Sequence, residues 1–597
     1  LAWGTQVNNM VKKAHVLSLI SLCAFLLCSC DLLNFLKKPT EEQHQHTYVL
    51  VAAKDATFYE DGVKEHYVCS GCNKTFDMGK NEKNPSEFST KIPLFETFDR
   101  TEPISLKGQD ISLTFDEEEV ATNISEGVAL KEKVVSKNAT PNEIQIWKTK
   151  NENLNKSTAT NYYYSDVLAD FEATTEAYET KNKIYKAYND LNDVYYSVFV
   201  EIAKDSTLKQ IFFKSYTEEQ LEEYIAKHTP SSGGGGGGTP SLSQQMETIL
   251  NNYKAGSIER YPAYSQYVAL AKQLAEEKHK PSYLDYAYTF FDREYTVAEA
   301  ETFSSLVKTY IKPLYQQFST KLTNANQVSS NIEGSNNLTN NFFGKNMNLL
   351  RKYGENLGEP YKTNFQKLFE EGHYFFSDHE NKNVTAYTAN SPALGRYILL
   401  TKKYQDMMSL VHEFGHYNAQ EIFGSVSSLD LSEIQSNGNE ILLLSFMKEN
   451  SGIDENVVKT YTYKQLYNTT RSILLGCAVN EFEKFVYNNE FTQETMENKW
   501  SEILNEYGLS IGNKLDYLYQ VVLNYRGYYI SYAVSGVAAL ELYQKGITDF
   551  ASAAQSYKSI YTKDSDNEKF ELSLENAGLS SVFEASSYTS LSQLGNI

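Results

Sequence analysis

The sequence predicts a mainly α-helical globular protein. Long stretches after Asn161, such as 178–191 and 297–322, carry apolar residues at the spacing of one helix face. Segments that alternate between apolar and polar residues, as half-buried strands do, are few in this region. Apolar residues make up 41% of the chain, and its 45 tyrosines and 31 phenylalanines are far too many for a disordered protein.

The charge of the chain excludes two classes of partner. It carries 55 basic and 76 acidic residues, a formal net charge of −21. This acidity argues against a nucleic-acid partner and against direct binding to an anionic membrane surface. We expect the charge to favour solubility, and it says little else about partners.

Residues 1–30 have the features of a secretion signal. A basic pair follows Met10, and the apolar run at 16–27 is too short to span a bilayer comfortably; the residues before Met10 look like upstream translation. The run ends in Leu-Cys-Ser-Cys, which resembles the lipobox of bacterial lipoproteins and would make Cys30 the lipidated first residue. We expect a protein secreted across the cytoplasmic membrane and anchored at the cell surface by lipid only. The alternative is an ordinary signal peptide with incidental cysteines, which also places the mature protein outside the cytoplasm.

Residues 40–95 are predicted to form a small module around Cys69-Ser70-Gly71-Cys72. It resembles the small cysteine-knuckle modules that are often appended to bacterial surface proteins. His44, His46 and His66 are near the pair in sequence, so both thiolates with one or two of these histidines are candidates for a second zinc site. A simple disulfide between Cys69 and Cys72 is equally compatible with the spacing, and a catalytic redox role is less so.

We expect a connector at 96–155 and a helical domain at 156–597. The connector is polar, with short strand-like pieces at 104–106 and 111–114. Six consecutive glycines, Gly233–Gly238, form a flexible tether within the helical domain, which we interpret as a tolerated loop insertion and not as a domain boundary.

The motif His412-Glu413-Phe414-Gly415-His416 predicts a metal-dependent hydrolase. Residues four apart share one face of a helix, so His412 and His416 can direct ring nitrogens at one zinc ion. The Glu413 carboxylate can then take a proton from a water whose pKa the zinc lowers towards about 7. The preceding Met407–Val411 is apolar and helix-compatible, as a buried helix requires. Two surface histidines on an ordinary helix are the alternative.

Glu433 is the candidate third metal ligand. It lies 21 residues beyond His412, and Glu440 follows two helical turns later, where it could support a ligand. The alternative is a solvated acidic helix face. Asn437-Gly438-Asn439 is a turn signal, which argues against one continuous helix across both glutamates.

Over roughly residues 160–597 the sequence resembles the oligoendopeptidase F and thimet oligopeptidase family of zinc peptidases, which are of the HExxH gluzincin type. Three stretches carry the resemblance. They are Ser282–Tyr288, the stretch from Tyr397–Leu400 through Asp406 into His412–His416 with Glu433 at the third-ligand position, and the cluster of Tyr525, Tyr529, Tyr532 and Ala533.

The resemblance implies two helical lobes around a deep catalytic channel, with a small β element beside the motif helix. Val384–Tyr387 and Tyr397–Leu400 are the candidate strands, and an exposed edge could pair with an extended peptide substrate. The implied activity is hydrolysis of internal bonds in short peptides. The sequence gives no information on cleavage preference, physiological peptides or oligomeric state.

The tyrosine cluster has an implied catalytic role. By the resemblance, Tyr525 and Tyr532 would donate hydrogen bonds to the oxyanion or to bound peptide, as a preorganised phenol can without burying a charge. Core packing is the alternative for a tyrosine-rich helix, and it would explain Tyr528 or Tyr529 equally well.

Two departures from the family pattern bear on activity, and the first of them motivates a second hypothesis, against which the intact Glu413 speaks. The family usually has a histidine shortly before the tyrosine cluster, where this chain has Gln520 or its neighbours, and Ala419 stands where another histidine is common. Neither change removes a ligand or the general base, so we expect activity at a reduced rate. The alternative is a surface peptide-binding protein that has lost efficient catalysis. In a third hypothesis, the Cys69 module binds a wall component and is the functional part.

Overall fold

The computed structural model describes residues 45–90, 111–229, 241–329, 346–381, 384–424, 428–560 and 569–597. The chain divides into two compact units, 1–92 and 93–597. The predicted signal and lipobox, His44, the strand-like piece at 104–106 and the glycine tether lie outside the described residues. No helix in the described ranges is long and apolar enough to cross a membrane.

The N-terminal unit is built from short strands. An antiparallel sheet has the order β1-β3-β4-β5, formed by β1 (Tyr48–Val51), β3 (His66–Cys69), β4 (Thr75–Phe76) and β5 (Glu82–Lys83). A second pair joins β2 (Gly62–Val63) to β6 (Ser89–Thr90), and a short 3₁₀ turn, η1 (Pro85–Phe88), lies between β5 and β6 in sequence.

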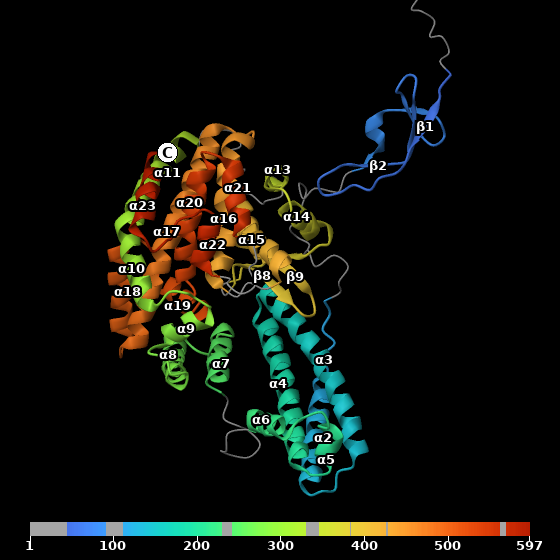
Figure 1. The fold of residues 1–597 in the computed structure, drawn as a ribbon, viewed down its shortest axis with the longest axis vertical. Coiled ribbons are helices and arrows are strands. Elements are labelled where there is room, and N and C mark those ends of the chain that lie inside the picture. Colours follow the sequence, from blue (N-terminus) through green and yellow to red (C-terminus); the bar gives the residue numbers. More distant parts are fainter. Residues whose placement is uncertain are drawn as a thin grey trace, which may run out of the picture. The chain divides into compact units, whose positions relative to one another are not determined.

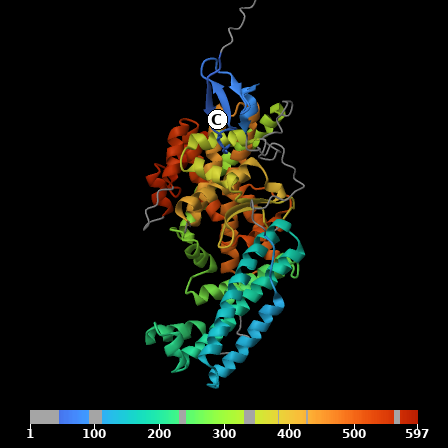
Figure 2. The ribbon, with the colours of Figure 1, turned by 90° about the vertical axis from the view of Figure 1, so that its right-hand side faces the viewer.

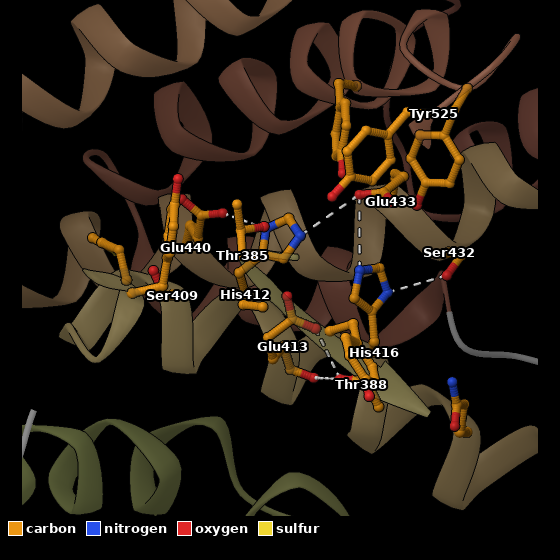
Figure 3. Close-up of a pocket in the computed structure, with 17 residues that line it drawn as sticks. Thr385, Thr388, Ser409, His412, Glu413, His416, Ser432, Glu433, Glu440 and Tyr525 are labelled. Atoms are coloured by element: carbon orange, nitrogen blue, oxygen red, sulfur yellow. Dashed lines mark hydrogen bonds and ion pairs between the residues drawn. The ribbon is translucent and has the colours of Figure 1, made fainter. Parts of the chain in front are cut away.

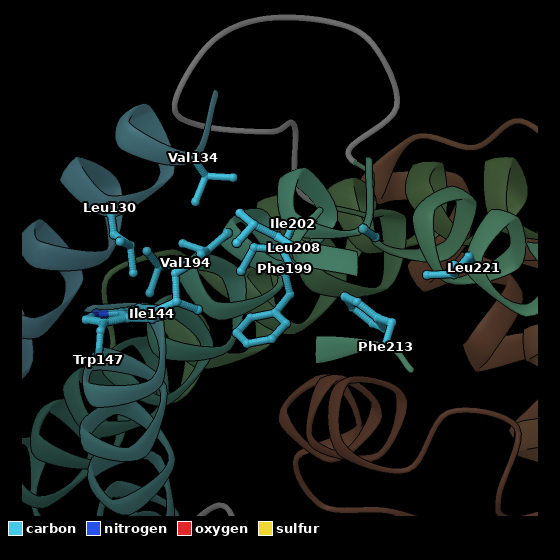
Figure 4. Packing of buried hydrophobic residues seen from close by; sticks show 12 residues of the cluster. Leu130, Val134, Ile144, Trp147, Val194, Phe199, Ile202, Leu208, Phe213 and Leu221 are labelled. Carbon is cyan, nitrogen blue, oxygen red and sulfur yellow. The ribbon is translucent and has the colours of Figure 1, made fainter. Parts of the chain in front are cut away.

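The second unit is mainly helical, as predicted, and its first helices form a group with their own apolar core. Helices α3 and α4 run side by side over most of their length (Figures 1 and 2). Buried side chains from all five helices of the group, including Trp147, Phe199 and Leu208, pack together in its interior (Figure 4). The group comprises α2 (Glu117–Val135), α3 (Pro141–Glu172), α4 (Thr175–Lys204), α5 (Leu208–Phe212) and α6 (Glu218–His228).

This group corrects the connector predicted for 96–155, which is helical from Glu117 onward. The Asp116 carboxylate caps α2, because it accepts hydrogen bonds from the amides of the second and third residues of that helix. Helix α3 begins at Pro141, after a capping box between Thr140 and Glu143. The polar composition concealed amphipathic helices, whose buried apolar residues such as Leu130 and Ile144 pack in the shared core. The piece 111–114 is not a strand; it is irregular.

The remaining helices carry the predicted motif and its surroundings. Figure 1 shows α16 and α20 packed against each other, with α15 and α17 beside them. Their bounds are α7 (Leu242–Lys254), α8 (Arg260–Glu277), α9 (Tyr283–Phe290), α10 (Val297–Leu306), a π-helical turn η3 (Val307–Ile311), α11 (Lys312–Ser329), α13 (Met347–Leu357), α14 (Tyr361–Glu370), α15 (Met407–Phe423), α16 (Leu429–Asn450), α17 (Glu455–Asn488), α18 (Gln493–Tyr507), α19 (Lys514–Asn524), α20 (Ile530–Gly546), α21 (Phe550–Ser559), α22 (Phe570–Asn576), α23 (Ala585–Leu591) and the 3₁₀ turn η6 (Ser592–Asn596).

A small sheet lies beside α15, as predicted. Its order is β7-β9-β8, formed by β7 (Tyr374–Phe376), β9 (Gly395–Leu400) and β8 (Ala386–Ser391), and a 3₁₀ turn, η5 (Lys402–Tyr404), leads from it to α15. Strand β8 begins at Ala386, not at Val384, because Ala386 pairs with Leu400, the last residue of β9. Buried Val167 of α3 packs against Phe375 and Leu399, which joins the first helical group to this sheet.

Candidate metal centre

Helix α15 presents both histidines of the motif on one face. Its first turn is capped by Asp406, whose carboxylate accepts hydrogen bonds from the amides of Met408 and Ser409 at 2.9 and 3.0 Å. This cap sets the start of the helix. Because the two histidines are four residues apart on the helix, the centroids of their rings lie 5.1 Å apart.

Helix α16 supplies the third donor because it crosses α15 at Gly415. A Cβ atom at Gly415 would lie 2.5 Å from the carbonyl oxygen of Gln435, so only glycine permits this approach. Asn439 strengthens the crossing by donating to the carbonyl of Val411 at 2.7 Å. The close packing brings Glu433, two residues before Gln435, against the two histidines.

The turn expected at Asn437–Asn439 is not formed, because α16 runs unbroken through it. A Cβ atom at Gly438 would lie 3.1 Å from both Leu542 and Tyr557, so this glycine allows close packing of α16 against its neighbours. The continuous helix keeps Glu433 and Glu440 on one side, as their seven-residue spacing predicts.

Donor atoms of His412, His416 and Glu433 lie within 4.8 Å of one another. The Nε2 atoms of His412 and His416 are 3.7 and 3.8 Å from the same Glu433 oxygen (Figure 3). Two ligands bound tetrahedrally to one zinc ion at about 2.1 Å would be about 3.4 Å apart. Two imidazoles and a carboxylate are a common zinc donor set, so these residues fit a zinc ion.

The second nitrogen of each imidazole already has a partner. His412 Nδ1 lies 2.6 Å from Glu440 Oε1, and His416 Nδ1 lies 3.1 Å from the Ser432 hydroxyl. These contacts fix the ring orientations and leave both Nε2 atoms directed at Glu433. Glu440 therefore occupies the supporting position predicted for it, and Ser432 is a second such residue.

The two histidines differ in their affinity for protons. Burial opposes a charge on His412. The hydrogen bond to Glu440 and the charge of Glu440 outweigh burial and raise the pKa of His412 to about 10. Burial and the charge of His412 lower the pKa of His416 well below its ordinary value. His416 is thus neutral before a metal binds, whereas His412 would release its proton on binding one.

Glu433 is completely buried, and hydroxyl groups bind its carboxylate. Tyr528 donates to Oε1, and Ser436 donates to Oε2 at 3.2 Å. Sequence reasoning did not select Tyr528, although it shares a helical spacing of three and four residues with Tyr525 and Tyr532. That spacing was the available signal.

Glu413 lies beside the donor group and is held by strand β8. The Thr388 hydroxyl is 3.0 Å from the Glu413 carboxylate and 2.7 Å from its main-chain oxygen (Figure 3). Burial raises the pKa of Glu413 to about 7, although the charge of His412 opposes the rise. A carboxylate with this pKa can both accept and deliver a proton near neutral pH. The sequence pattern gave no indication of Thr388.

A cavity of about 470 Å³ opens onto these groups (Figure 3). Thr385 and Thr388 of the sheet region line it, and so do Tyr525, Tyr528 and Tyr532. The structure thus brings both predicted tyrosines to the cavity and adds Tyr528.

Three positions discussed from the sequence, Tyr529, Gln520 and Ala419, are not among the residues that line this cavity. Tyr529 packs against the rings of Tyr525 and Tyr532, so the core-packing interpretation holds for this tyrosine.

The cluster has more carboxyl groups than imidazoles. Glu413, Glu433 and Glu440 surround two imidazoles, of which only His412 binds a proton strongly. Burial raises the pKa of Glu433, as it does that of Glu413. Buried carboxylates are costly without a cation, so the electrostatics, like the geometry, fit a divalent metal.

Comparison with known proteins places the fold. No protein-family model matches the sequence, and no curated protein matches it. Among solved structures, the chain is similar to PZ peptidase A with inhibitor 2, at 15% identity over 81% of this chain and 97% of that one, with a TM-score of 0.51. It is also similar to a 3.1 Å structure assigned as an oligoendopeptidase F, at 16% identity over 85% and 98% of the two chains, with a TM-score of 0.50.

These likenesses show the fold. The chain has the helical fold of PZ peptidase A and oligoendopeptidase F, which confirms the fold expected from the resemblance. Within it, His412, His416 and Glu433 form a group that fits an HExxH-type zinc site.

Proposed function

We propose that this protein is a zinc-dependent metalloendopeptidase that hydrolyses internal bonds of short peptides. The observation that carries the proposal is the convergence of His412, His416 and Glu433, with Glu413 beside them at the cavity. Supporting it are the oligopeptidase fold and the partners that hold each of these side chains.

His412, His416 and Glu433 would hold the zinc ion. When bound, zinc supplies Lewis-acid chemistry: it polarises the peptide carbonyl and makes water a stronger nucleophile at neutral pH. Glu413 takes the proton from the attacking water and delivers it to the departing amine nitrogen, and its place at the cavity beside the three donors suits both transfers. Thr388 keeps the Glu413 carboxylate in place through these steps. Tyr525 and Tyr532 donate to the developing oxyanion or to the bound peptide.

The sheet offers a place for the peptide backbone. Strand β8 pairs with β9 and is one of the two edge strands of the described sheet. Residues Thr385–Thr388 line the cavity, so an extended peptide paired with this edge would pass the Glu413 carboxylate. Main-chain pairing gives affinity with little side-chain selectivity, which suits an enzyme that trims diverse short peptides. A deep channel, as the resemblance implies, would exclude folded proteins.

We further propose that the enzyme works outside the cytoplasm as a lipid-anchored cell-surface protein. The support is the sequence alone: a basic pair, a short apolar run and a lipobox-like end at Cys30. In this location the substrates would be nutrient or signalling peptides.

The deciding experiment changes the proton carrier and spares the metal ligands. Glu413→Gln keeps the shape of the side chain but removes its basic carboxylate, so turnover of quenched fluorescent peptides should fall roughly 10²- to 10⁴-fold. Zinc content should stay near wild type, because Glu413 is not one of the three donors.

A tyrosine pair provides a matched control. Tyr532→Phe removes a hydroxyl that would donate a hydrogen bond to the oxyanion, so kcat should fall by at most roughly 10³-fold. Tyr529→Phe removes a hydroxyl that does not line the cavity and should leave kcat near wild type. The peptidase proposal fails if zinc-loaded wild type cleaves no member of a diverse peptide library, or if Glu413→Gln is as fast as wild type. Peptide binding without turnover would then support the surface-binding alternative, with the missing histidine near Gln520 as the first suspected cause.

A further inference from the structure

A second group of metal-binding side chains lies in the N-terminal unit, and the sheet register creates it. Strand β1 pairs antiparallel with β3, with Tyr48 opposite Cys69. The pairing continues past the strand ends, because Ser70 donates its amide to the Thr47 carbonyl at 3.0 Å. One step further, His46 faces the turn that contains Cys72.

The turn itself brings the two cysteines together. Cys69 donates its amide to the carbonyl of Lys74 and accepts from the amide of Asn73, which closes a tight loop between β3 and β4. Asn73 has a positive φ of 57°, the conformation that such a loop requires. Neither cysteine forms a disulfide; Cys69 is buried and Cys72 is exposed.

The side chains then converge. Donor atoms of His46, Cys69 and Cys72 lie within 4.8 Å of one another, and His46 Nδ1 is 3.4 Å from the Cys72 sulfur. Sulfur and nitrogen ligands on one tetrahedral zinc ion would be about 3.6 Å apart. Of the other two candidate histidines, His66 does not belong to this group of converging donor atoms, and His44 lies outside the described residues.

The small core of this unit gives an independent reason for a metal. Within 45–90, the described part of the unit, its buried apolar side chains are Phe58, Cys69, Phe76 and Phe88. A core in a chain of this length rarely supplies more than about 3–5 kcal/mol, and small modules usually depend on a disulfide or a metal.

We propose that His46, Cys69 and Cys72 bind a structural zinc ion that stabilises the N-terminal unit. The two thiols bind as thiolates and release their protons on binding. This site shares no residue with the centre on α15 and α16, so it stands independently of the proposed peptidase activity.

The test uses the full-length chain, purified under reducing conditions. Wild type should hold one zinc ion more per chain than the Cys69→Ser/Cys72→Ser double variant. Cys477→Ser, a control that removes the buried cysteine of the helical unit, should keep the wild-type zinc content. Cleavage of short peptides should be unchanged in both variants.

Cobalt substitution identifies the ligands. Cobalt-loaded wild type should show the near-ultraviolet charge-transfer absorption of cobalt–thiolate bonds, and the double cysteine variant should lack it. Because the centre on α15 and α16 has no thiolate, this absorption reports on the new site even if the peptidase proposal fails. His46→Ala should release the metal at a lower chelator concentration than wild type, whereas the exposed control His279→Ala should not.

Three results would overturn the proposal. The first is equal zinc content in wild type and the double cysteine variant. The second is a cobalt-loaded wild type without thiolate absorption. The third is an intact mass of wild type, measured without reductant, that is two hydrogens below the mass of the reduced chain, when the double variant shows no such loss and wild type holds no more zinc than the double variant. That result would assign a Cys69–Cys72 disulfide instead.

Discussion

Glu440 is the most informative residue to perturb, because it touches a proposed ligand but is not one of the three donors. Its Oε1 lies 2.6 Å from His412 Nδ1, so Glu440→Gln keeps the size of the side chain and removes its charge. Loss of such a supporting contact typically costs 10- to 100-fold in metal affinity. We therefore expect the zinc Kd to rise by that factor, which is about 1.4–2.7 kcal/mol.

The assay is a competition for zinc between the protein and a chelator, followed by peptide turnover at saturating zinc. Glu449→Gln is the matched control, because Glu449 is an exposed acid on the same helix. A merely structural role for Glu440 would lower the thermal stability of the zinc-free protein, whereas a positioning role should leave it near wild type. An unchanged zinc Kd in Glu440→Gln would refute the reasoning.

Four further predictions concern other parts of the chain. Gly415→Ala should lower the free energy of unfolding by about 1–3 kcal/mol, because the added Cβ meets main-chain atoms of α16; in denaturant titrations, Gly512→Ala, where a Cβ has open space, should not. Thr388→Val should lower kcat/KM for peptides roughly 10-fold by removing a hydrogen bond to Glu413, with zinc content unchanged; equal kinetics would rule out the positioning role. Burial raises the pKa of Glu483 to about 7 from 4.5, so the folded protein holds this proton more tightly than the unfolded chain does. Wild type should therefore lose about 3 kcal/mol relative to Glu483→Gln as the pH rises from about 4.5 through about 7, and a pH-independent difference in their denaturant midpoints would contradict this. Cys30→Ser should move the protein out of the membrane fraction or block its maturation, and unchanged fractionation would leave only the ordinary signal-peptide interpretation.

The sequence alone determined the features that depend on neighbours along the chain. The side-by-side placement of His412 and His416 follows from their four-residue spacing on a helix. The seven-residue spacing of Glu433 and Glu440 likewise predicted one ligand and one supporting carboxylate. Helical periodicity after Asn161 was sufficient for the fold class. It was insufficient for 117–155, where polar faces concealed the amphipathic pattern.

Only the tertiary structure decided which distant side chains meet. The approach of Glu433 to the histidines depends on the close crossing of α15 and α16 at Gly415. Helix α16 is continuous, although the local sequence pattern had predicted a turn within it at Asn437–Asn439. Thr388 and Tyr528 reach the centre from a strand and a helix start that are far from the motif in sequence. No spacing rule connects such residues, because their contacts are set by the packing of whole elements and not by the geometry of one.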